Sequence, residues 1–204
     1  MTVRQILDQV SALRRHTFTD AQLLTWLNEV EGHIMTDVFL WPIGRVYEYV
    51  LALTASGVTV SFPDDHTMLL SEDAGYAPGG KLKIEELTTY SGNNGSNYAI
   101  LTVSDDGLTV GFADGTFADT GTDADTAKLT YDGSGCPMLV LPPHDKLYRP
   151  YLLAQVAFAQ EEWDGYSNYM ALFNEYLGEY RRWFGRHYTP EMRGRWPHAR
   201  RWIL

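Results

Sequence analysis

The sequence predicts an α+β protein: a four-helix bundle that is interrupted by a small antiparallel β-sandwich or barrel and followed by an extended basic C-terminal tail. Apolar residues near both ends of the chain recur every three to four positions, the spacing of an amphipathic helix. In the middle they alternate with polar residues, the spacing of a half-buried strand. Charge marks the same division, because residues 46–141 hold 14 of the 26 acidic residues but only 3 of the 16 lysines and arginines. The predicted segments are N-terminal helices (1–45), an acidic inserted β-domain (46–141), C-terminal helices (142–188) and the tail (189–204).

The first segment is expected to form two short antiparallel helices. Apolar residues from Val3 to Leu13 form one stripe on a helix surface. A second stripe begins after Thr19, which stands three residues before Gln22 as in a capping box. Pro42 is expected to end this helix, because proline cannot donate the hydrogen bond that a helix interior needs.

The middle segment is expected to form a few short strands. Val58, Val60 and Phe62 alternate with polar neighbours, and residues 105–107 (Asp-Asp-Gly) form a hairpin signal between two such runs. The Asp/Thr/Gly-rich stretch Asp114–Asp125 is interpreted as a long exposed loop. Short strands separated by glycine-rich turns are typical of a small antiparallel sandwich or barrel.

Two more helices are expected after the Pro142-Pro143 pair. The first, His144–Trp163, places Leu147, Tyr151, Ala154 and Phe158 on a common face. A break at Asp164-Gly165 is expected to separate it from a long final helix that reaches about His187. Because neither pair of helices could bury its apolar stripe alone, the two pairs are expected to pack together as a four-helix bundle.

The last segment, 189–204, contains two prolines and a glycine, so no long helix is expected there. Basic and aromatic residues on an extended chain suit insertion into a groove of a partner, where arginine and tryptophan are strong anchors. The candidate binding residues are Arg193, Arg195, Trp196, Arg200, Arg201, Trp202, Ile203 and Leu204. Two alternatives stay open: the tail folds back on its own domain, or its arginines contact DNA.

The sequence carries no recognisable catalytic or cofactor-binding motif, since GxGxxG, P-loop, HExxH, CxxC and GxSxG patterns are all absent. The nearest metal-like string is Asp119, Asp123 and Asp125. It lacks the glycine and the glutamate of a calcium loop, so a solvated acidic loop is the preferred interpretation. Neighbouring carboxylates such as Asp64-Asp65 are expected on opposite faces of a strand or in hydrated turns, which disfavours a hydrolase. We therefore predict a protein that is not an enzyme and has no catalytic residue, metal or cofactor.

Cellular location can also be inferred from composition. Charged residues interrupt the start of the chain, so no signal peptide is expected, and no apolar run approaches the length of a membrane span. The single cysteine, Cys136, excludes an internal disulfide and indicates a reducing cytoplasm. Cys136 is expected to be a small buried hydrophobe rather than a nucleophile.

Several short stretches of the expected helices are similar to one known family. They are Leu24–Gly32, Pro143–Tyr148, Tyr151–Gln155, Tyr166–Asn168 and Phe173–Tyr176. These stretches resemble the head–tail connector proteins of tailed bacteriophages, the adaptor or head-completion subunits. The likeness covers residues 19–40 and 142–187.

The resemblance implies a structural virion protein that assembles as a ring, usually dodecameric, under the portal protein. Its partners would be other copies of the chain, the portal, and a neck, stopper or tail-proximal protein. Packaged DNA would pass through the lumen without sequence-specific binding, and no membrane would be involved. The ring would lie in the neck of the virion after assembly in the host cytoplasm.

The same resemblance bears on the tail and on the middle segment. In such adaptors a C-terminal extension docks against the portal, which agrees with the tail interpretation. Family members often join the second and third helices by a short link, whereas residues 46–141 intervene here. The β-domain is therefore expected to project from the ring.

A second class of function stays open, in which the β-domain binds carbohydrate or a host surface. Such a site needs exposed aromatic residues on one face of the domain. The candidates are Tyr47, Tyr49, Tyr76, Tyr90 and Tyr98, and each of them could equally pack in the core.

Overall fold

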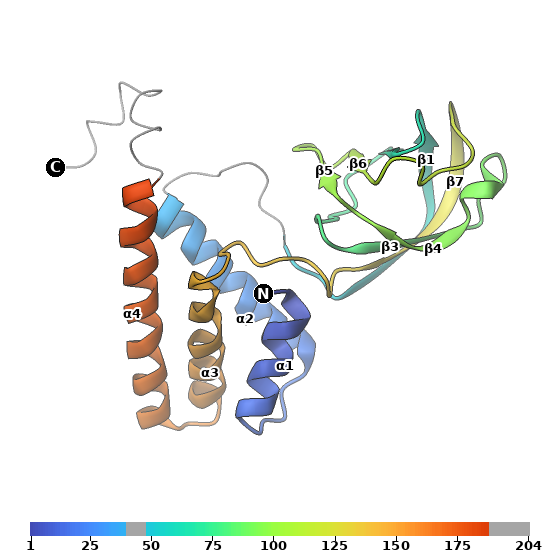
Figure 1. Cartoon of the computed structure of the whole chain (residues 1–204). Coiled ribbons are helices and arrows are strands. Elements are labelled where there is room, and N and C mark those ends of the chain that lie inside the picture. Colours follow the sequence, from blue (N-terminus) through green and yellow to red (C-terminus); the bar gives the residue numbers. More distant parts are fainter. Residues whose placement is uncertain (40–47, 188–204) are drawn as a thin grey trace.

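The computed structural model describes residues 1–39 and 48–187 and shows an α+β protein with a helical part and a β part (Figure 1). The helices are α1 (Val3–Leu13), α2 (Asp20–Ile34), α3 (Tyr148–Ala159) and α4 (Trp163–His187), with a π-helical turn (Met35–Phe39) after α2 and 3-10 turns at Ser91–Asn93 and His144–Leu147. The strands are β1 (Ala52–Phe62), β2 (Thr67–Leu70), β3 (Lys81–Glu85), β4 (Gly95–Ala99), β5 (Thr102–Val103), β6 (Thr109–Gly111) and β7 (Gly121–Asp132). The predicted tail and Pro42 lie outside the described residues.

The first two helices begin at matching capping boxes. The Thr2 hydroxyl accepts the backbone N–H of Gln5, and the Gln5 side chain accepts the N–H of Thr2 at 2.9 Å. The same exchange joins Thr19 and Gln22 at the start of α2, as the sequence predicts. Each pair satisfies two N–H groups that have no partner inside the helix.

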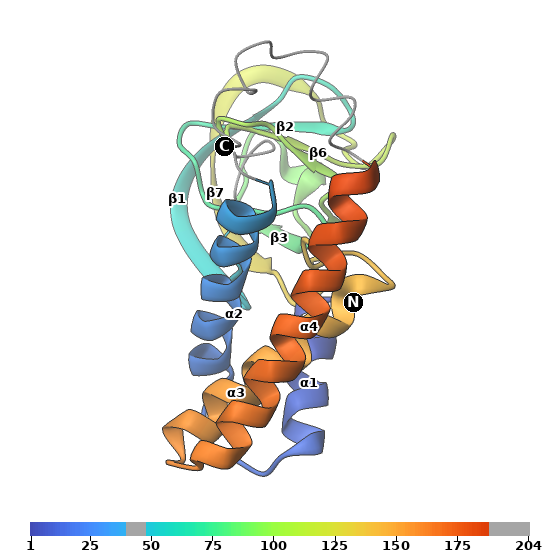
Figure 2. The same cartoon turned by 90° about the vertical axis from the view of Figure 1, so that its left-hand side faces the viewer.

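The predicted four-helix bundle is wrong. α3 is the central helix: α4 packs along it most extensively, and α1 and α2 also pack against it (Figure 2). The reason is that α3 is buried on almost every side instead of along one stripe. Its buried residues are Tyr148, Pro150, Tyr151, Leu152, Leu153, Ala154, Val156 and Ala157. A helix that is apolar all round is surrounded by its neighbours, whereas a bundle needs one apolar stripe on each helix.

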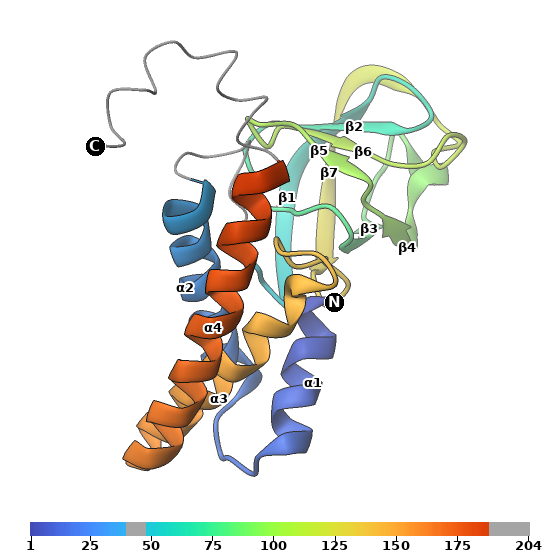
Figure 3. The ribbon, with the colours of Figure 1, turned by 60° about the vertical axis from the view of Figure 1, so that its left-hand side comes forward.

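The predicted small sandwich or barrel is also wrong, because the strands form one larger antiparallel sheet. This seven-stranded sheet has the order β4-β3-β7-β1-β2-β6-β5. The two longest strands, β1 and β7, pair in its centre from Ala52 opposite Asp132 to Phe62 opposite Gly121. Only two residues, Ile100 and Leu101, join the edge strands β4 and β5, so the sheet must curl until its edges approach each other (Figure 3).

Polar strand residues explain why the sequence underestimates this sheet. The loop predicted at Asp114–Asp125 is wrong in its second part, because Gly121–Asp125 opens β7. The first half of β1 is also largely exposed and carries little apolar signal. Pairing between two long strands holds such residues extended whatever their individual propensity.

A glycine bends the central strand β1. Gly57 has a φ of +74°, and the register against β7 shifts between Ser56 and Val58. An extra residue at a positive φ forms a β-bulge, which glycine adopts without steric cost. The bulge therefore contributes to the curl of the sheet.

Both parts share one continuous apolar core that runs from the helices into the sheet. Its largest fully buried side chains include Tyr148 from the helical part and Tyr76, Tyr131 and Phe62 from the β part. Among the helices of the described chain, none combines the length and the apolar character that crossing a bilayer requires.

Candidate functional site

The chain passes from the helical part into the β part before β1 and returns after β7. Polar side chains of α2 hold both of these crossings. The amide of Asn28 binds the backbone of Tyr49 twice: Nδ2 donates to the Tyr49 carbonyl at 3.0 Å, and Oδ1 accepts the Tyr49 N–H at 2.9 Å. Tyr49 lies just before β1, so this clamp fixes the point where the chain enters the sheet. Two well-formed hydrogen bonds in a half-buried place each contribute roughly 1 kcal/mol to stability.

Glu31, one helical turn after Asn28, binds both crossings. Its Oε1 accepts the backbone N–H of Leu139 at 3.1 Å, on the segment that leaves the sheet, and the Tyr49 hydroxyl at 3.4 Å. The other oxygen, Oε2, is buried without a hydrogen-bond partner among the described residues. The Glu31 side chain is only 4 % exposed, and burial raises the pKa of its carboxyl to about 7, although hydrogen bonds oppose the shift.

The carboxyl of Glu31 therefore titrates near neutrality inside the junction. The sequence contains a signal for it: Glu31 lies on the same helix face as Leu27, Val30 and Ile34, where a charged residue is unexpected. Because it links α2 to both crossings, Glu31 couples the packing of the helical part to the position of the β part.

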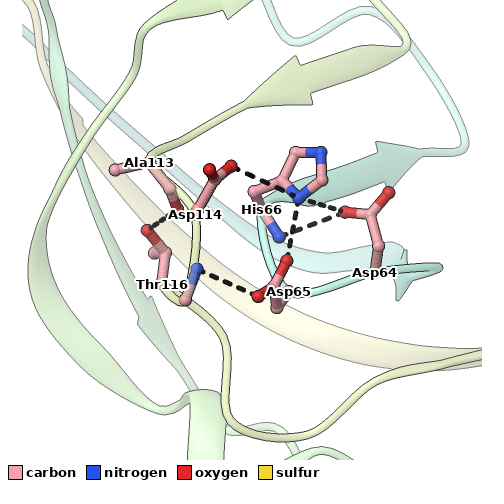
Figure 4. A network of polar contacts seen from close by, with 7 residues as sticks. Asp64, Asp65, His66, Ala113, Asp114 and Thr116 are labelled. Atoms are coloured by element: carbon pink, nitrogen blue, oxygen red, sulfur yellow. Dashed lines mark hydrogen bonds and ion pairs between the residues drawn. The ribbon is translucent and has the colours of Figure 1, made fainter.

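A second polar cluster lies on the surface of the β part, in the turn between β1 and β2 (Figure 4). The Nδ1 atom of His66 is 2.8 Å from Asp65, 3.3 Å from Asp64 and 3.9 Å from Asp114. The hydrogen bond to Asp65 and the charges of all three carboxylates raise the pKa of His66. Asp65 also accepts the N–H of Gly115, which ties this turn to the loop after β6.

This cluster has a structural explanation without a ligand. Ligand atoms of Asp64, Asp65 and His66 lie within 4.8 Å of one another, a spacing that could hold a divalent cation. All three side chains are, however, at least 44 % exposed and already hydrogen-bonded within the turn. When it is protonated, the imidazole supplies positive charge next to the carboxylates. The sequence indicates the Asp64-Asp65 pair but not its pairing with His66.

The calcium-like string does not converge on one point. Asp125 accepts the backbone N–H groups of Thr88, Thr89 and Tyr90, the last at 3.1 Å. Asp119 accepts the N–H of Gly92 at 2.7 Å. The prediction of a solvated loop is wrong for Asp125, which is 7 % exposed and anchors the segment after β3.

Other candidate residues have packing roles. Cys136 is buried, as predicted, and burial raises the pKa of its thiol, which leaves it unreactive. Of the tyrosines considered for carbohydrate, Tyr49, Tyr76 and Tyr90 are buried. Tyr98 is half-buried against Phe112 and Phe117, and Tyr47 lies outside the described residues.

The most exposed aromatic surface lies where α3 turns into α4, which we call the α3–α4 corner: Leu13, Phe158, Glu161, Trp163 and Asp164. Leu13 at the end of α1 is 59 % exposed, Phe158 is 50 % exposed, and Trp163 is 60 % exposed. The rings of Phe158 and Trp163 contact each other edge to face, with centroids 5.5 Å apart. Phe158 and Trp163 thus form an apolar patch that no described part of the chain covers.

The corner has a fixed backbone shape. The N–H of Glu161 donates to the Phe158 carbonyl and that of Glu162 to the Ala157 carbonyl, the pattern of a Schellman motif. Glu161 takes the left-handed position with a φ of +60°, which glycine usually occupies. Arg14, at the end of α1, pairs with Glu162 and so holds α1 against the turn.

The turn at the corner comes a few residues before the break that the sequence predicts at Asp164-Gly165, and α4 runs through that pair. The helix predicted at His144–Trp163 ends instead at Ala159, and α4 begins at Trp163. Phe158, predicted on the buried face of α3, is half exposed at the corner. The eight tail residues predicted to bind a partner lie outside the described residues.

Sequence comparisons do not place the chain in a family. A scan against known protein families finds no match, and a search of curated proteins finds no similar sequence.

Proposed function

We propose that this chain is a structural subunit of the head–tail connector of a tailed bacteriophage. In this proposal, copies of the chain form a ring under the portal, extend the DNA channel and provide the platform for the neck and tail. Packaged DNA passes through the lumen without sequence-specific contact. The protein acts in the neck of the virion and not as an enzyme.

The observation that carries the proposal is the exposed α3–α4 corner. Phe158 and Trp163 leave large apolar rings in water, and Leu13 is exposed at the end of α1. Contiguous exposed apolar surface of this kind typically marks a protein contact. A ring needs such a contact on every subunit, and many small repeated interfaces add up to a stable assembly.

The use of polar groups also supports a structural role. Within residues 1–39 and 48–187, the buried carboxylates of Glu31 and Asp125 bind backbone N–H groups. Both carboxylates therefore hold neighbouring segments of the chain together. The clamp at Asn28 and Glu31 further suits a subunit that must carry mechanical load between its two parts.

The order of the elements agrees with the resemblance stated for residues 19–40 and 142–187. The first two helices precede the sheet and the last two follow it, so the β part is an insertion within a helical part. The resemblance assigns segment 189–204 to the portal and adds a neck, stopper or tail-proximal protein as the partner on the other side.

The experiment is a mass measurement by light scattering on the purified chain, alone and mixed with the portal of the same phage. We expect a stoichiometric ring complex with the cognate portal and none with the portal of an unrelated phage, which serves as control. A mixture in which both proteins keep their separate masses refutes the connector proposal.

A further inference from the structure

The α3–α4 corner carries unpaired negative charge next to its apolar patch. Glu161 and Asp164 are exposed on either side of Trp163. Within the described part of the chain, neither carboxylate has an ion-pair partner, whereas Glu162 is paired with Arg14. The corner thus offers aromatic rings flanked by two free carboxylates, and its ligand should combine apolar side chains with positive charge.

The chain itself contains a segment of this composition. Residues 189–204 hold four arginines against one glutamate, together with Trp196, Trp202, Ile203 and Leu204. Tryptophan and arginine are the residues most often responsible for binding energy at protein contacts. The segment and the corner are therefore complementary in both charge and apolar character.

The length of the chain limits which residues of the segment can reach the corner of their own copy. The corner lies at the start of α4, at Trp163, and the segment follows its other end, His187 (Figure 1). This helix is about 36 Å long from end to end, at about 1.5 Å per residue. Trp196 follows His187 by nine residues, which span at most about 31 Å when fully extended. Trp196 therefore cannot reach the corner of its own copy, so docking that uses both tryptophans requires a second copy. Arg200 and Trp202, 13 and 15 residues after His187, span at most about 44 and 51 Å and could reach either copy.

We propose that segment 189–204 of one copy docks on the α3–α4 corner of a second copy. Its tryptophans pack against Phe158 and Trp163, and its arginines pair with Glu161 and Asp164. The inference rests on the proposed function only in treating the chain as a self-assembling subunit. The same segment could instead dock on the portal, and it would then leave the α3–α4 corner of the second copy.

The test measures the mass of the full chain by light scattering over a range of concentrations, without any portal. We expect reversible association that weakens at high salt, because ion pairs contribute. The double variant Phe158→Ser with Trp163→Ser should weaken association about tenfold or more. The matched control is Leu101→Ser, an equally exposed apolar residue of the β part, which should leave association unchanged.

A charge exchange tests the pairing itself. Glu161→Lys with Asp164→Lys should weaken association, and adding Arg200→Glu with Arg201→Glu should restore it. Asp105→Lys, an exposed carboxylate elsewhere, is the control. Circular dichroism checks that each variant is folded. If the serine variant does not fold, the charge variants still test the inference.

Two outcomes overturn the inference. One is a chain that stays monomeric at every concentration, and the other is association that neither the serine variant nor the charge variant weakens. Because no portal is present, either outcome leaves the mass measurement with portal free to support or refute the connector proposal by itself.

Discussion

Replacing Glu31 by glutamine should remove a pH-dependent weakness at the junction between the two parts. The carboxyl is 4 % exposed and its pKa is raised from 4.5 to about 7 by burial. The folded state therefore binds this proton more tightly than the unfolded state does. Stability from this group is complete below pH 4.5, falls as the pH rises towards 7, and does not fall further above that.

The size of the effect follows from the shift. A difference of 2.5 pKa units corresponds to about 3 kcal/mol of stability lost at high pH. Between pH 5 and pH 8.5 the loss is about 2–3 kcal/mol, because some ionisation has already occurred at pH 5. Glutamine keeps the oxygen that accepts the Leu139 N–H and never ionises, so Glu31→Gln should lack this loss.

The assay is urea unfolding of the wild-type chain and of Glu31→Gln at pH 5 and at pH 8.5. Unfolding is monitored by the near-ultraviolet circular dichroism of the tyrosine side chains. We expect similar stability at pH 5 and a more stable variant at pH 8.5. Other titrating groups, such as His66, act equally in both proteins and cancel. Glu29→Gln, an exposed residue of the same helix, is the control. Equal pH dependence in the wild type and in Glu31→Gln would refute the reasoning.

Three further changes test the hydrogen bonds and the backbone. Asp125→Asn should destabilise the chain by about 2 kcal/mol or more in urea unfolding, because an amide N–H₂ then faces backbone N–H donors. Unchanged stability would contradict the anchor role of Asp125. Asn28→Ala should cost about 1–3 kcal/mol and speed hydrogen exchange of the Tyr49 N–H, and normal protection of that amide would contradict the clamp. Glu161→Gly should raise the thermal unfolding midpoint by relieving about 1 kcal/mol of left-handed strain, whereas Glu161→Ala should not.

Apolar periodicity predicts that helices flank a β region but not how the helices pack. The capping box at Thr19 and Gln22 is local, so the sequence shows it directly. The surroundings of α3 are not local. The consecutive buried residues Leu152, Leu153 and Ala154 lie on different sides of one helix, and a search for a single stripe counts only part of them. The predicted bundle fails for this reason.

The site residues differ in the same way. Leu27, Val30 and Ile34 already define a buried face on α2, so Glu31 could have been recognised as a buried acid. The cluster at His66 could not, because Asp114 comes from a loop 48 residues later in the chain. The α3–α4 corner depends on a turn that ends α3 at Ala159, and a glutamate in a left-handed position gives no sequence signal for such a turn.

The acidic charge of the β part has an internal explanation that bears on where the basic segment docks. Aspartates in this part accept backbone N–H groups in turns and loops: Asp64, Asp65, Asp73, Asp106, Asp119, Asp125 and Asp132. Aspartate favours such positions because its short side chain mimics a backbone carbonyl. Half of the acidic residues of this part therefore serve turn and loop formation, and Lys83 pairs with Glu85. Within residues 1–39 and 48–187, Glu161 and Asp164 accept no such hydrogen bond, so they can offer their carboxylates to a basic partner without losing one.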